Sequence, residues 1–73
     1  MFKVMVECKN VKSEKIAKIL DKVTNNFNIW LHDDSVYAFF RIKSLEQLKK
    51  VKEKLSRIEF RFIKIQKVKR LWI

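Results

Sequence analysis

Residues 36–42 carry the clearest candidates for chemistry, because aromatic rings and a guanidinium group recur there at every second position. Tyr37, Phe39 and Arg41 follow the period of two that is typical of a half-buried β-strand, so all three point to one face. Exposed aromatic rings stack on bases of any identity, and a nearby arginine binds phosphate. The spacing predicts a nucleic-acid-binding platform on this strand, whose other face is formed by Val36, Ala38, Phe40 and Ile42.

Further candidates lie on neighbouring segments. Met5 occupies the exposed register of the predicted first strand and would complete the apolar patch. The basic second helix is either a separate phosphate-binding surface or a solvated face that is partly neutralised by Glu46 with Lys50 and by Glu53 with Arg57. Basic side chains at the sheet edge and in the C-terminal tail are expected to neutralise phosphates: Lys3, Arg61, Lys64, Lys67, Lys69 and Arg70.

The net charge is strongly positive and unevenly distributed. Lys and Arg number 18 against 8 acidic residues, which gives a net charge of +10. Residues 1–40 carry a net charge of +1 and residues 41–73 carry +9. Such a field attracts a polyanion over about 8–10 Å. The alternative is a solubilising surface of the kind found in thermophiles, but that alternative predicts charges of both signs interspersed along the chain.

The composition argues against the large enzyme classes. The chain contains no glycine, which excludes phosphate-binding loops, dinucleotide fingerprints and nucleophile elbows. One cysteine and one histidine exclude an internal disulfide and the common zinc sites. Cys8 is interpreted as a small core residue, and His32 beside Asp33 and Asp34 as a solvated turn. We therefore expect a protein without catalytic activity, metal or cofactor.

Two sequence features bear on the compartment. No apolar run approaches the ~20 residues needed to cross a bilayer, so no membrane partner is expected. A lone cysteine suits a reducing interior. The sequence therefore predicts a cytoplasmic protein.

The order of the predicted elements indicates the fold class. Strand, helix, strand, strand, helix, strand is typical of the α+β ferredoxin-like βαββαβ fold, a four-stranded antiparallel sheet with two helices on one face. Right-handed crossovers would place the first and third strands in the centre. One domain is expected over residues 1–66, with 67–73 as a basic tail or a strand extension. Strands are predicted at 2–8, 28–31, 36–42 and 59–66, and helices at about 13–26 and 45–58.

Helix ends and one strand irregularity can also be predicted. Ser13 is expected to cap the first helix, and Ser44 the second, with Gln47 completing a capping box. The segment 60–65 has apolar residues in both registers, so either a bulge switches faces near residues 62–63 or both faces are covered.

The third predicted strand resembles the RNA-recognition motif (RRM) family. The family octamer reads basic, Gly, aromatic, Gly or Ala, aromatic, aliphatic, any, aromatic. Residues 35–42 agree at Tyr37, Ala38 and Phe39, and approximately at positions 40 and 42, whereas Ser35 replaces the basic residue and Val36 the glycine. The resemblance implies RNA binding with Tyr37 and Phe39 as the base-stacking pair.

These features predict a non-catalytic nucleic-acid-binding protein, with RNA favoured over DNA. A ribosome-associated protein or a regulator of RNA would both fit. The alternative is a homo-oligomeric domain like the ACT-type domains, in which the open sheet face pairs with a second copy and the charge confers only solubility. A third possibility is that residues 71–73 cover the platform.

Overall fold

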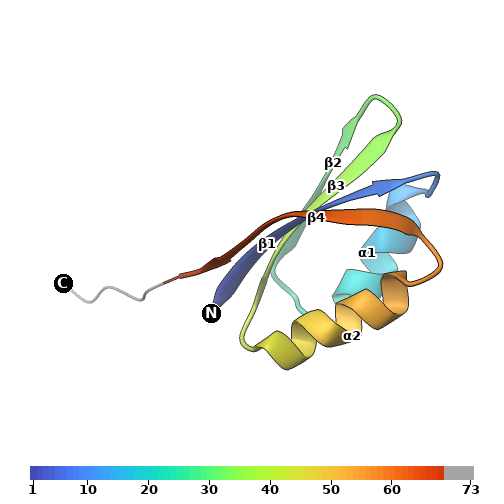
Figure 1. Ribbon diagram of the computed structural model, residues 1–73. Coiled ribbons are helices and arrows are strands. Elements are labelled where there is room, and N and C mark those ends of the chain that lie inside the picture. Colours follow the sequence, from blue (N-terminus) through green and yellow to red (C-terminus); the bar gives the residue numbers. More distant parts are fainter. Residues whose placement is uncertain (69–73) are drawn as a thin grey trace.

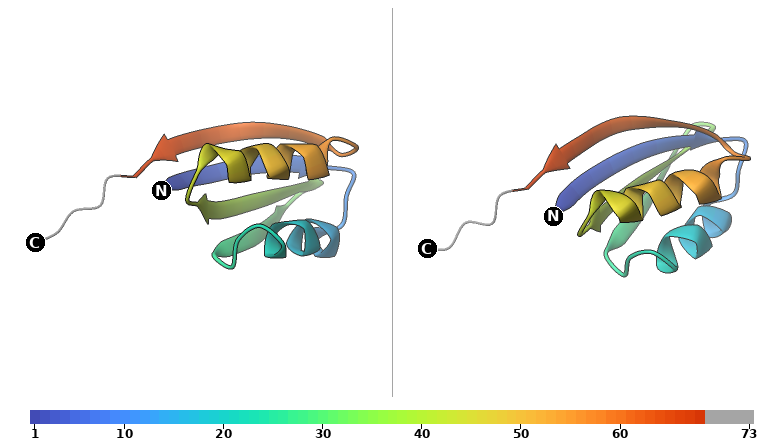
Figure 2. Two further views of the ribbon diagram at one scale, coloured as in Figure 1. Left: turned by 90° about the horizontal axis from the view of Figure 1, so that it is seen from below. Right: turned by 60° about the horizontal axis from the view of Figure 1, so that its bottom comes forward.

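The computed structural model describes residues 1–68 and contains one antiparallel sheet and two helices (Figure 1). The elements are β1 (Phe2–Lys9), α1 (Ser13–Asp21), β2 (Phe27–His32), β3 (Ser35–Ile42), α2 (Leu45–Leu55) and β4 (Glu59–Lys67). The strand order is β2-β3-β1-β4, which confirms that the first and third strands are central. Both helices lie on the same face of the sheet (Figure 2), so the chain has the predicted ferredoxin-like α+β fold.

The core lies between the sheet and the helical layer. Alternate residues of β1 and β3 point toward the helices, and each helix contributes the apolar stripe spaced by three or four residues. The buried hydrophobic residues are Val4, Val6, Cys8, Ile16, Leu20, Val36, Ala38, Phe40, Ile42, Leu48, Val51 and Leu55. Within residues 1–68, no helix has the length and apolar character required to cross a membrane.

The first helix differs from the prediction at both ends. Ser13 is its first helical residue, and the capping position is Lys12, so the predicted Ser13 cap is wrong. The helix also ends at Asp21 instead of near residue 26. The Thr24 hydroxyl donates a hydrogen bond of 2.8 Å to the Arg41 carbonyl oxygen and accepts one from the Asn26 amide. This turn directs the chain into the sheet, and β2 begins at residue 27, one residue before the predicted strand.

The second helix begins as predicted, but its cap is formed differently. Ser44 occupies the capping position without a side-chain hydrogen bond to the helix. Instead, Gln47 accepts a hydrogen bond of 2.6 Å from the Lys43 amide and donates one of 3.2 Å to the Val23 carbonyl oxygen. Gln47 therefore links the start of α2 to the end of α1.

A bulge in β4 resolves the ambiguity of segment 60–65. Val6 pairs with Phe62 and Met5 pairs with Lys64, so Ile63 is the extra residue on the β4 side. Phe60 and Phe62 face the helices before the bulge, and the register then places Lys64 on the open face. The alternative in which a bulge switches the register is therefore confirmed. β4 extends through residue 67, one residue beyond the predicted strand.

Deletion of Ile63 tests this assignment. Without the extra residue, Phe62 and Lys64 alternate faces as in a regular strand, so we expect the fold to persist. The free energy of unfolding should fall by no more than about 1 kcal/mol, as measured by urea unfolding.

Deletion of Phe39 is the matched control. β3 pairs with both of its neighbours without a register shift, so this deletion would turn Phe40 to the open face and Arg41 into the core. We expect that variant not to fold. An unfolded Ile63 deletion, or a folded Phe39 deletion, would contradict the assignment.

Candidate nucleic-acid interface

The face of the sheet opposite the helices collects most of the residues predicted to bind nucleic acid. Register places Lys3 opposite Arg41 and Met5 opposite Phe39 on the two central strands. Lys64 follows on β4 as the partner of Met5. We call this surface the open face. Its side chains, assigned by register and alternation, include Lys3, Met5, Glu7, Asn28, Trp30, Tyr37, Phe39, Arg41, Arg61, Lys64 and Gln66.

The predicted tail residues do not share this arrangement. Lys67 is the last residue of β4 and pairs with Phe2, which places it in the register that faces the helical side. Lys69, Arg70 and the segment 71–73 lie outside the described residues. Their predicted contribution to binding, and the predicted covering of the platform, stay predictions.

Trp30 on β2 belongs to the open face and was not among the predicted site residues. Its ring centroid lies 5.5 Å from that of Phe39, with the two planes tilted by 52°. The side chain is 64% exposed, although exposed tryptophan is costly in so small a domain. A signal for it existed in the sequence: pairing outward from the turn at residues 33–34 places Trp30 opposite Tyr37.

The open face also contains the ionised carboxylate of Glu7. The Tyr37 hydroxyl donates a hydrogen bond of 2.8 Å to Glu7 Oε2, and Arg61 Nη2 donates one of 3.0 Å to Glu7 Oε1. The Tyr37 hydrogen bond is the main cause that lowers the pKa of Glu7 from its ordinary 4.5, the Arg61 charge adds to it, and burial opposes it. The same hydrogen bond raises the pKa of Tyr37 above 10.0.

This network gives two predicted site residues a structural partner. Glu7 is only 8% exposed, so its charge requires the partners that surround it. Arg61 lies on the open face as predicted and forms an ion pair with Glu7, while its side chain is 71% exposed. Its predicted contact with a phosphate stays a prediction. Tyr37 is held by its hydroxyl at the β1 side of β3.

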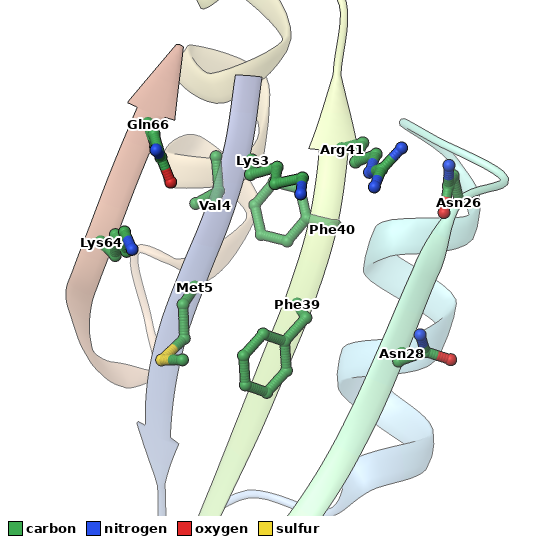
Figure 3. Close-up of a pocket in the computed structure, with 10 residues that line it drawn as sticks. All are labelled: Lys3, Val4, Met5, Asn26, Asn28, Phe39, Phe40, Arg41, Lys64 and Gln66. Atoms are coloured by element: carbon green, nitrogen blue, oxygen red, sulfur yellow. The ribbon is translucent and has the colours of Figure 1, made fainter. Parts of the chain in front are cut away.

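A hollow of about 610 Å³ lies at the end of the open face away from Glu7 (Figure 3). Three cationic side chains line it, Lys3, Arg41 and Lys64, together with Phe39 and Met5. The lining contains no acidic residue. We call this site the basic hollow; its remaining lining residues are Val4, Asn26, Asn28, Phe40 and Gln66.

Two other residues, Cys8 and His32, have side chains that could do chemistry. Cys8 is fully buried, and burial raises the pKa of its thiol to about 11, as expected of a core residue and not of a nucleophile. His32 Nε2 lies 3.4 Å from Asp33 Oδ2, and both side chains are exposed at the turn. Residues 1–68 hold no group of three or more potential metal ligands.

The solvent-exposed side of α2 is basic. Its expected ion pairs, Glu46 with Lys50 and Glu53 with Arg57, are not formed among the described residues, whose ion pairs are Glu7 with Arg61 and His32 with Asp33. The exposed cations of this surface are Lys49, Lys50, Lys52, Lys54 and Arg57. The Lys52 Nζ of this surface lies 5.7 Å from the centroid of the half-buried Phe62 ring.

No protein-family model matches the chain, and no curated protein has a sequence that matches it.

Glu7→Gln tests the buried carboxylate. Because its pKa is lowered in the folded state, Glu7 contributes stability above pH 4.5, and this contribution disappears as the pH falls through the lowered pKa. We expect the variant to be less stable than the wild type at pH 7 and nearly equal to it at about pH 2. Thermal unfolding between these pH values measures the difference.

Glu53→Gln is the control, since it removes one carboxylate from an exposed position of α2. A stability difference between wild type and Glu7→Gln that does not change with pH would contradict the assigned role of Glu7.

Proposed function

We propose that the chain is a non-catalytic protein that binds single-stranded nucleic acid, RNA in preference to DNA, through the open face. The observation that carries this proposal is the basic hollow, where three cations without an acid surround Phe39 and Met5. Flat apolar surface beside positive charge is the combination that an unpaired base and its phosphate require. A role as a ribosome-associated protein or as a regulator of RNA, in the cytoplasm, fits this chemistry.

Exposed aromatic surface supports a single strand over a duplex. Trp30 and Phe39 form a tilted pair with Trp30 mostly exposed, so bases could stack there only if they are free of their own duplex partners. A purely electrostatic binder has no need of such rings.

Two further features support RNA. The resemblance of residues 35–42 to the RRM octamer implies RNA, with Tyr37 and Phe39 as the stacking pair. The amides of Asn26, Asn28 and Gln66 also line the hollow, and they provide donors and acceptors for a 2′-hydroxyl.

The rival ACT-like dimer uses the same face. Its subunit interface would bring together two copies of a surface on which Lys3, Arg41 and Lys64 have no acidic neighbour in the lining. Like charges brought together cost free energy, whereas a polyanion satisfies them. The charge of the open face therefore favours the nucleic acid.

Titration of single-stranded RNA and duplex DNA of equal length, repeated across salt, tests the proposal. Neutralisation of phosphates by the cations of the hollow predicts that log K falls linearly with log salt, at a slope of about −0.7 for each phosphate contacted. We expect tighter binding to the RNA, and a preference that persists at high salt. Equal, weak binding that vanishes at high salt, together with a dimer in sedimentation, would favour the rival.

Trp30→Ala and Phe39→Ala test the stacking surface. Loss of one stacked base costs about 1–3 kcal/mol, so each variant should bind RNA about 5- to 150-fold more weakly. Leu31→Ala is the matched control, because Leu31 is 69% exposed on the same strand but lies in the register that faces away from the open face. Equal losses in Leu31→Ala and Trp30→Ala would remove the open face from the binding site.

A further inference from the structure

The open face is electrostatically divided along the strands. In the half that contains the basic hollow, Lys3, Arg41 and Lys64 have no acid beside them. In the other half, Glu7 is paired with Arg61, and the register places Glu59 opposite Lys9, so the charges cancel. Within the open face, a phosphate therefore gains attraction at the hollow and not in the half around Glu7.

The volume of the hollow is comparable to that of a ligand site. Its volume of about 610 Å³ lies within the ~300–1,000 Å³ of pockets that hold small organic ligands. Figure 3 shows Phe39 and Met5 on adjacent strands at one end, with Lys3 and Arg41 farther along the same strands. Residues two apart on a strand are separated by about 7 Å. That spacing is comparable to the separation between a base and its own phosphate.

We infer that the basic hollow binds one nucleoside-phosphate unit, with its base against Phe39 and Met5 and its phosphate between Lys3 and Arg41, while Lys64 lies beside Met5 at the edge of the site. This assignment rests on the proposed function and adds the position and orientation of the ligand. The RRM octamer begins with a basic residue at the position of Ser35, whereas here the uncompensated cations lie toward the opposite end of β3. The phosphate site is therefore placed at the Arg41 end of the strand.

The side-chain amides complete the site. Asn28 lies on β2 opposite Phe39, and Gln66 lies on β4 opposite Lys3, so the two amides flank the hollow from its two sides. Amide groups at these positions can form hydrogen bonds with the sugar hydroxyls and with the edge of the base. Inorganic phosphate has neither group, and a free base has no sugar.

Trp30 provides a direct reporter of occupancy. The chain has two tryptophans, so Trp72→Phe leaves Trp30 as the one fluorophore of its type, 5.5 Å from Phe39. The probes are adenosine 5′-monophosphate, adenosine, inorganic phosphate and a tetra-adenylate RNA, each titrated against this variant. We expect adenosine monophosphate to change the Trp30 emission at concentrations at least about tenfold lower than adenosine or phosphate.

Arg41→Gln in the same background should weaken binding of the monophosphate and of the tetranucleotide by about tenfold. Lys50→Gln is the matched control, because it removes one exposed cation from α2 and should change binding less than about twofold. Circular dichroism establishes that both variants are folded.

The outcomes separate the subsite from the general function. Two results would overturn the subsite and leave the proposed function standing. In the first, Arg41→Gln and Lys50→Gln weaken RNA binding equally. In the second, adenosine binds as tightly as its monophosphate. Absence of any RNA binding by the full chain overturns both. If the tetranucleotide binds more tightly than the monophosphate, the hollow binds a nucleotide within a strand. If the two affinities are equal, the hollow binds a free nucleotide. Both results support the subsite.

Discussion

Covering only one face of the sheet is the constraint on which the rest of this structure depends. Side chains of a strand alternate between two faces, so two helices that bury Val4, Val6 and Ala38 leave the intervening residues on a face that no helix covers. A domain of this size has little apolar surface to spare. Trp30 is nevertheless 64% exposed on this face, beside the half-buried Phe39, and the proposed binding of a base would account for that exposure.

Charge divides the same face into two halves. Glu7 accepts hydrogen bonds from Tyr37 and Arg61, and this network connects β1, β3 and β4 at one end of the sheet. At the other end, Lys3 and Arg41 line a hollow without an acidic residue in its lining. Under the proposed function, this second half is the one that attracts a phosphate. The neighbours of a charged side chain on the open face therefore matter as much as its sign.

The sequence was sufficient to predict the fold class and the central strand of the candidate site. Alternation over residues 36–42 depends on local steric rules and is present in the structure, as is the predicted strand order. For segment 60–65 the sequence left two alternatives open, and the structure has the bulge. The end of α1 could not be predicted, because the Thr24 hydroxyl bonds to Arg41, a residue 17 positions away. Gln47 at the start of α2 is similar, since its partner Val23 lies 24 positions away, in the turn after α1.

The same limit applies to the candidate site. The sequence does not show that Arg61 donates a hydrogen bond to Glu7, 54 positions away. Trp30 was missed because its short strand was not paired with β3 across the turn, although that register would have placed it beside Tyr37. Pairing between distant segments, and not the type of each residue, decides which charges and rings are available.

Mapping of amide chemical shifts on addition of a short single-stranded RNA tests the central claim most directly. Binding at the basic hollow predicts that the perturbed amides cluster at Lys3, Met5, Phe39, Arg41 and Lys64, with few changes in α2. Perturbation confined to Lys49, Lys50 and Lys54 on α2, with the open face unchanged, would contradict it.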